Sequence, residues 1–123
     1  MVKARGINIT EVLFEYYSDY KWAVHDEKYS GIVWKSDESH KPTESDINEK
    51  IIELKNAEPM RVLREERDQR LQETDWWACG DRMDSMTNEQ KIYRKKLRDL
   101  PSVAEPKIEN GKLTNVTWPT KPE

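Results

Sequence analysis

The chain has 123 residues, of which 37% are charged and 35% hydrophobic, and its net charge is −3. This length suits one domain of ordinary size. The slightly acidic balance excludes strong attraction to nucleic-acid phosphates or anionic lipid. No apolar run is long enough for a membrane span, and no signal peptide is recognisable. The single cysteine, Cys79, has no partner for an internal disulfide, which suggests a reducing, cytoplasmic environment.

The first expected element is a short amphipathic helix over residues 9–18. Asn8 and Glu11 have the spacing of a capping box. The β-branched and aromatic content of this stretch also suits a strand, so both assignments remain open. The apolar positions recur every three or four residues, as one helix face requires: Ile9, Val12, Leu13, Tyr16, Tyr17 and Tyr20.

A β-hairpin is expected next, within residues 21–34. Apolar and polar residues alternate on both sides of a polar turn, and Trp22 and Trp34 are placed for cross-strand pairing. An isolated hairpin is only marginally stable in water. We therefore expect it to pack on the first helix through Tyr16 or Tyr17.

Two charged helices follow. Thr43 is a favourable N-cap with acidic residues after it, and the helix that it starts should end near residues 56–58. The reason is Pro59, which disfavours helical geometry in the residue before it and suits the first position of a new helix, over residues 59–73. Opposite charges four residues apart should stabilise that helix: Arg61–Glu65, Arg64–Asp68 and Glu66–Arg70.

The last expected helix covers residues 88–99. Thr87 opens a second capping box, and Pro101 should end the helix. From Ser102 onward the chain has no helical period. We expect an extended, proline-rich tail there, with weak extended segments around the turn at Asn110-Gly111.

These elements predict an α+β fold. An N-terminal helix and a β-hairpin should pack with about three further helices, and an extended C-terminal tail should follow. Residues 1–58 would hold the first helix, the hairpin and a connecting helix. Residues 59–123 would form a helical domain that ends in the tail.

Three motifs mark the second half of the chain: LREERDQRLQETDW (Leu63–Trp76), TNEQKIYRKKLRDLP (Thr87–Pro101) and TWPTKP (Thr117–Pro122). In order and spacing they resemble the phage tail assembly chaperone-like domain. Residues Tyr29–Trp34 and Lys41–Ile47 resemble the leader that precedes this domain in short phage proteins. The resemblance implies a phage protein that works with tail or tail-fibre polypeptides.

The candidate partner-binding residues surround two adjacent tryptophans. Neighbouring residues point in different directions, so one indole can pack inward while the other meets a partner. Both indoles closing the helix pair is an equally good interpretation. Trp, Tyr and Arg are enriched at interface cores, and the residues predicted to bind a partner are Trp76, Trp77, Arg67, Arg70, Tyr93, Arg94, Leu97 and Trp118.

Two basic patterns have a simpler interpretation than ligand binding. The arginines spaced three apart from Arg61 to Arg70 suit a carboxylate clamp. Acidic residues lie among them, however, and alternating charge is typical of a solvated helix face. The basic cluster Arg94–Arg98 has only Tyr93 beside it for base stacking, so nucleic-acid binding is not favoured.

No pattern supports catalysis, a cofactor or a metal. His25, His40 and Cys79 lie far apart and lack the spacing of metal ligands. Cys79 also has no neighbouring base that would make it a nucleophile. The chain contains no glycine-rich phosphate loop. We therefore expect no catalytic, cofactor-binding or metal-binding residues.

Residues and resemblance together predict a non-enzymatic phage protein. It would bind a tail or tail-fibre polypeptide in the host cytoplasm and assist its assembly, without nucleic-acid or membrane partners. Three helices with narrow apolar stripes accompany five tryptophans, which suggests that another chain completes part of the apolar surface. The alternative is a permanent minor structural component of the phage tail, baseplate or fibre in the virion.

Overall fold

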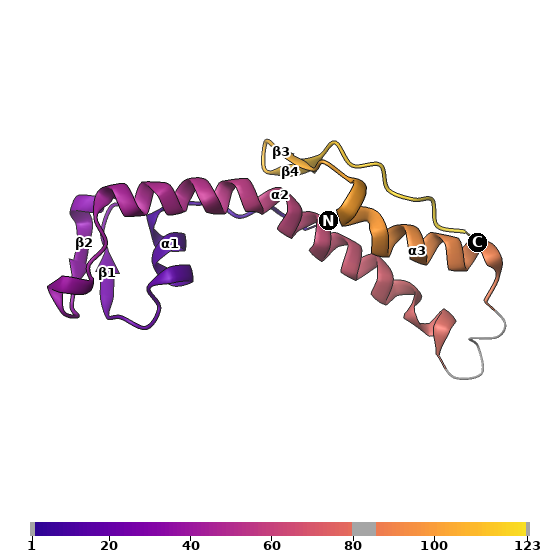
Figure 1. Cartoon of the computed structure of the whole chain (residues 1–123), viewed down its shortest axis with the longest axis horizontal. Coiled ribbons are helices and arrows are strands. Elements are labelled where there is room, and N and C mark those ends of the chain that lie inside the picture. Colours follow the sequence, from indigo (N-terminus) through magenta and orange to yellow (C-terminus); the bar gives the residue numbers. More distant parts are fainter. Residues whose placement is uncertain (1, 80–85, 123) are drawn as a thin grey trace. The chain divides into compact units, whose positions relative to one another are not determined.

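The computed structural model describes residues 2–79 and 86–122 (Figure 1). Within these residues lie three α-helices and two small antiparallel sheets, β1–β2 and β3–β4, consistent with the expected α+β class. None of the described helices combines the length and the apolar character needed to cross a membrane. The elements are α1 (Ile9–Tyr16), β1 (Trp22–Val24), η1 (Tyr29–Gly31), β2 (Ile32–Trp34), η2 (Glu38–His40), α2 (Glu44–Thr74), η3 (Asp75–Ala78), α3 (Asn88–Val103), β3 (Lys107–Glu109) and β4 (Lys112–Thr114), where η marks a short 3₁₀ helix.

The chain divides into two compact units. Residues 5–57 form the first, which we call the N-terminal unit. Residues 58–123 and the segment that ends at Ala4 form the second, the C-terminal unit. The division falls inside α2, so each unit is described separately below.

α1 is a helix, which decides between the two assignments left open by the sequence. Asn8 caps it as predicted, because its side-chain oxygen accepts a hydrogen bond of 3.1 Å from the backbone N–H of Glu11. Val12 and Leu13 are fully buried. The helix ends at Tyr16, two residues earlier than expected, and the N–H of Tyr17 bonds back to the Leu13 carbonyl at 3.0 Å.

The predicted hairpin is confirmed. β1 and β2 pair antiparallel, with Trp22 opposite Trp34. The indole N–H of Trp22 donates to the Tyr17 carbonyl at 2.9 Å, and the Trp34 ring stands edge-on to the Tyr17 ring at 6.2 Å. The hairpin therefore packs beside α1 through Tyr17. The buried residues of this core are Val12, Leu13, Ile32, Trp34, Ile47 and Leu54.

α2 continues through Pro59, so the predicted helix end at residues 56–58 is wrong. Proline in a helix interior removes one backbone hydrogen bond and costs about 3 kcal/mol. Side chains link the turns on both sides of it. Arg61 donates through Nη2 to the buried carboxylate of Glu58 at 3.0 Å and through Nη1 to Glu65 at 2.6 Å. The bond to Glu58 also raises the pKa of Arg61 above its usual value.

Thr43 caps the start of α2 as predicted. Its hydroxyl accepts a hydrogen bond from the N–H of Asp46, and the Asp46 carboxylate accepts one from the N–H of Thr43, both at 3.1 Å. Thr87 and Gln90 make the same reciprocal pair before α3. Local side-chain chemistry thus fixes where both helices begin.

In the C-terminal unit, α3 runs antiparallel to the last part of α2 (Figure 1). Arg67 reaches the Arg98 carbonyl at 3.5 Å, and Leu71 accepts a hydrogen bond from Arg94, so positions increase along α2 as they decrease along α3. A buried cluster joins Tyr93 and Leu97 of α3 to Trp77 of η3, the turn that follows α2. Leu71 of α2, Met86 and Trp118 pack against it.

α3 reaches Val103, two residues beyond Pro101, where the helix was predicted to end. Ser102 and Val103 are therefore helical, unlike the tail expected from Ser102 onward. Leu100 is buried, and its carbonyl accepts a hydrogen bond of 2.9 Å from the N–H of Ala104. Pro101 removes a single backbone hydrogen-bond donor. Burial of Leu100 outweighs the lost bond, so the helix continues for about half a turn beyond the proline.

The N-terminal segment joins the C-terminal unit, which no pattern in the sequence indicated. The N–H of Val2 donates to Glu66 Oε2 on α2 at 3.0 Å, and the N–H of Ala4 donates to the Gly111 carbonyl at 3.4 Å. Gly111 belongs to the Asn-Gly turn between β3 and β4, where Asn110 has φ 53° and Gly111 φ 75°. Both residues are common at such left-handed positions.

Gly31 provides a test of the hairpin. A Cβ at Gly31 would lie 1.9 Å from the carbonyl oxygen of His25, inside the contact that closes the hairpin. Gly31→Ala should lower the free energy of unfolding by about 1–3 kcal/mol, because the two segments must move apart. Gly6→Ala is the control, since a Cβ there meets nothing within 4 Å. Equal thermal midpoints of the two variants, measured by circular dichroism, would contradict this account.

The adjacent tryptophans provide a matched pair of variants for the C-terminal unit. Trp77 is 6% exposed and Trp76 is 53% exposed. Trp77→Ala should lower the free energy of unfolding by about 3–5 kcal/mol, because it leaves a cavity beside Tyr93. Trp76→Ala should cost less than about 1 kcal/mol. Denaturant titration of both variants measures the difference, and equal losses would show that the two indoles share the core.

Candidate functional site

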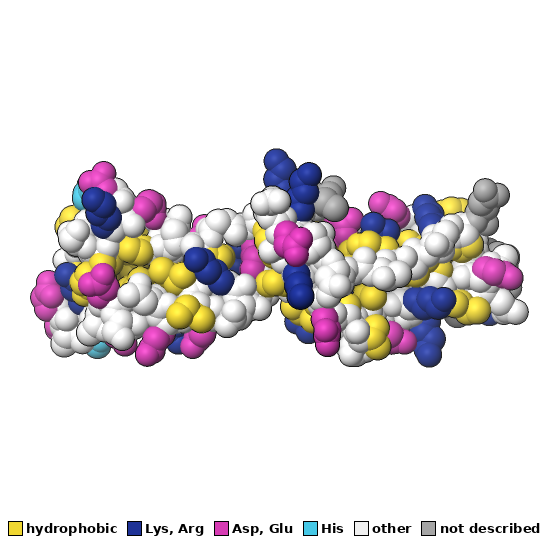
Figure 2. All heavy atoms as spheres, turned by 90° about the horizontal axis from the view of Figure 1, so that it is seen from above, with side chains coloured by type: hydrophobic (Ala, Val, Ile, Leu, Met, Phe, Trp, Pro, Cys, Tyr) yellow, Lys and Arg dark blue, Asp and Glu magenta, His cyan; other side chains and the backbone are white. Residues whose placement is uncertain are grey.

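Basic and acidic side chains are interspersed over the face of the chain in Figure 2, with apolar side chains between them. No large field of one sign covers that face. The charge on this face therefore gives no long-range attraction for polyanions.

The adjacent tryptophans differ in burial. Trp77, Tyr93 and Leu97 form the buried cluster and present little surface to a partner. Trp76 is about half exposed and stands edge-on to Trp77, with ring centroids 6.1 Å apart. The sequence left open which indole faces inward, and the structure assigns that position to Trp77.

Arg94 and Arg67 serve the helix pair. Arg94 donates to the Leu71 carbonyl at 3.0 Å and to the Thr74 hydroxyl at 2.7 Å, and it pairs with Asp75 at 3.0 Å. Arg67 pairs with its neighbour Asp68 at 2.9 Å. Arg94 therefore links α3 to the end of α2 and to η3, whereas Arg67 reaches α3 through its 3.5 Å contact with the Arg98 carbonyl.

Arg70 connects α2 to the C-terminal segment. Its guanidinium carbon lies 4.2 Å from the centre of the Trp118 ring, a cation–π contact. Its Nε is 3.5 Å from Glu66 Oε1, close enough for an ion pair, although the geometry does not make a hydrogen bond. The contact fixes the half-buried Trp118 against the helix pair.

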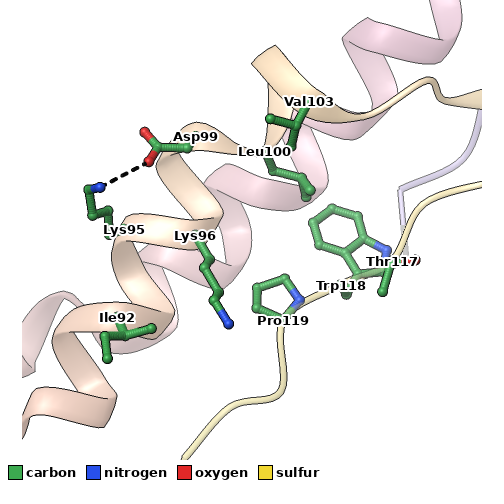
Figure 3. Close-up of a pocket in the computed structure, with 9 residues that line it drawn as sticks. All are labelled: Ile92, Lys95, Lys96, Asp99, Leu100, Val103, Thr117, Trp118 and Pro119. Atoms are coloured by element: carbon green, nitrogen blue, oxygen red, sulfur yellow. Dashed lines mark ion pairs between the residues drawn. The ribbon is translucent and has the colours of Figure 1, made fainter.

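Trp118 forms one wall of a groove, which we call the α3 groove (Figure 3). α3 supplies the opposite wall, and the space between them is about 580 Å³. Smaller hollows continue the groove to Pro122 at one end and to Asn115 at the other. The residues that line the main groove are Ile92, Lys95, Lys96, Asp99, Leu100, Val103, Thr117, Trp118 and Pro119.

The α3 groove combines apolar walls with a lysine, Lys96, that has no ion-pair partner among the described residues. Ile92 and Val103 are 53% and 76% exposed. Lys95 pairs with Asp99 at 3.8 Å, whereas Lys96 makes no ion pair with any described residue. A groove of this kind suits apolar side chains that lie next to a carboxylate.

Of the residues that line the α3 groove, only Trp118 was predicted from the sequence to bind a partner. The spacing of Ile92 and Lys96, four apart on one helix, was an available signal that both share a face. Val103 could not be found in this way, because Pro101 was expected to end the helix. Their proximity to Trp118 depends on how the C-terminal segment folds back along α3.

The residues considered as metal ligands have other surroundings. His40 stacks on Tyr20 with ring centroids 5.3 Å apart, and the Cys79 thiol donates to the Asp75 carbonyl at 3.2 Å. Among the described residues, no group of three or more His, Cys, Asp or Glu side chains is placed to hold a metal ion.

The pKa of Asp37 is lowered by the hydrogen bond from the backbone N–H of Ser39, which caps η2.

Comparison with known proteins finds one family. Its model, described as phage tail assembly chaperone protein, matches residues 60–123. No curated protein and no solved structure matches the chain. The matched region contains α3, the C-terminal segment and every residue that lines the α3 groove. This region is just over half of the chain. The chain therefore belongs to the phage tail assembly chaperone family, as the resemblance of its sequence motifs indicated.

Proposed function

We propose that this protein is a non-enzymatic assembly factor that binds a segment of a phage tail or tail-fibre polypeptide in the α3 groove. It would act in the host cytoplasm while the tail is assembled. The observation that carries the proposal is the exposed apolar surface of the groove, which includes Ile92 and Val103. Family membership supports a role in tail assembly, and the exposed groove supports the proposal that the client binds there.

Burial of apolar surface supplies the main favourable energy of such a contact. Fully burying an aliphatic side chain contributes about 1.5–3 kcal/mol. Covering the exposed parts would contribute about half of that for Ile92 and about three quarters for Val103. Trp118 is held in place by Arg70 before any client arrives. A wall that is already ordered reduces the entropic cost of binding.

Lys96 defines the chemistry of the client further. Its ammonium group has no ion pair with a described residue and lines both the main groove and the hollow beyond it. A client segment with aliphatic or aromatic side chains and one nearby carboxylate would complement this arrangement. The charge pair would contribute mostly to orientation, since exposed pairs contribute about 0–1 kcal/mol.

A co-expression experiment tests this proposal. The tagged chain is produced together with the tail and fibre polypeptides of its phage, and the captured subunit is identified by mass spectrometry. Ile92→Asp should reduce capture of that subunit by about tenfold or more, because a charge would be buried in the apolar wall. Ile52→Asp is the matched control, since Ile52 is an equally exposed isoleucine on α2 that does not line the groove.

A charge-reversal pair examines the role of Lys96 in the same assay. Lys96→Glu should weaken capture, whereas Lys91→Glu changes the charge of the same helix at an exposed position outside the groove. If each variant captures as much client as its control, the α3 groove is not the binding site.

Purified virions distinguish the assembly factor from the alternative, a permanent minor component of the tail, baseplate or fibre. An assembly factor should be absent from virions or present far below the amount of any tail subunit. Stoichiometric amounts of the chain would instead establish a structural role.

A further inference from the structure

A second exposed hollow lies in the N-terminal unit, outside the residues that the family model matches. Its volume is about 480 Å³. Phe14 is 63% exposed and stands edge-on to Trp22, with ring centroids 5.2 Å apart. The residues that line this aromatic–lysine hollow are Phe14, Ser18, Tyr20, Lys21, Trp22 and Lys35.

The hairpin holds the two lysines of the hollow opposite each other. The N–H of Lys35 donates to the Lys21 carbonyl at 2.8 Å, which continues the β1–β2 register past the pair Trp22 and Trp34. Like charges directly across a strand pair are unfavourable. Neither lysine makes an ion pair with a described residue, and none of the residues that line the hollow is acidic. An anionic group between the lysines would remove this repulsion.

We infer that the aromatic–lysine hollow binds an acidic segment of another protein. An apolar side chain of that segment would cover Phe14 and Trp22, while neighbouring carboxylates would lie between Lys21 and Lys35. Each part of the hollow then meets its complement, since aromatic faces bury apolar surface and ammonium groups pair with carboxylates.

The charge of the surrounding unit favours a protein segment over a nucleic acid. Acidic side chains outnumber basic ones among residues 5–57. A long polyanion would be repelled by this unit wherever it extended beyond the two lysines. A short acidic segment needs only the hollow itself. The inference concerns a different unit from the α3 groove, so it does not depend on the proposed function.

A titration of the full chain tests this inference. The ¹⁵N-labelled protein is mixed with a peptide of alternating glutamate and leucine, and in parallel with a peptide in which lysine replaces glutamate. The acidic peptide should shift the indole N–H signal of Trp22 and the amide signals of Lys21 and Lys35. The basic peptide should leave these signals unchanged.

Variants of the hairpin then locate the site. The double variant Lys21→Glu, Lys35→Glu should weaken binding of the acidic peptide by about tenfold or more. Lys28→Glu is the control, because Lys28 is an exposed lysine between β1 and β2 that does not line the hollow, and it should change affinity by less than about twofold. If the double variant fails to fold, Phe14→Ser should cause a similar loss, since it removes the most exposed ring of the hollow.

Three outcomes would overturn the inference. The first is equal affinity of the wild-type chain and the Lys21→Glu, Lys35→Glu variant for the acidic peptide. The second is tighter binding of a single-stranded DNA oligonucleotide than of the peptide, which would make the hollow a nucleic-acid site. The third is self-association that sedimentation detects in the wild-type chain and that Phe14→Ser abolishes, which would assign the surface to a second copy.

Discussion

The hydrogen bonds of Arg94 join the end of α2 to the middle of α3, and the C-terminal unit depends on them. The end of a helix leaves carbonyl groups without partners and carries partial negative charge. The last turn of α2 contains no basic residue of its own. Arg94 supplies the missing cation from the neighbouring helix, through bonds to Leu71, Thr74 and Asp75. The end of α2 would lack this cation without α3 beside it.

Two neighbouring faces of α3 have different surroundings. Tyr93 and Leu97, four residues apart, enter the buried cluster with Trp77. Ile92 and Lys96, also four apart, then lie on a neighbouring face that lines the α3 groove. The same helix thus closes the core of the unit and lines an exposed groove. Trp118 belongs to both regions, since it packs against the cluster and forms a wall of the groove.

The α3 groove is small in comparison with a permanent protein interface. Nine residues line the main groove, whereas stable protein interfaces involve about 20–30 residues on each side. Under the proposed function, a client held by a few apolar contacts and one lysine would be able to dissociate when its place in the tail becomes available. The aromatic–lysine hollow of the N-terminal unit has a similarly limited extent.

The sequence by itself determined the elements whose causes are local. The caps at Asn8, Thr43 and Thr87 and the pairing of Trp22 with Trp34 follow from residues that are near one another along the chain. The three motifs of the second half were also enough to indicate the family. Capping and turn chemistry act over a few residues, so they can be recognised without knowledge of the fold.

Only the tertiary structure decided the features that depend on distant contacts. α2 passes through Pro59, and α3 passes through Pro101, because packing and side-chain bonds outweigh the local cost of each proline. The inward position of Trp77 required Tyr93 from another helix, and the α3 groove required the C-terminal segment to lie along α3. Apolar periodicity indicates that a helix has a buried face. Which segment covers each part of that face depends on packing between segments that are far apart in the sequence.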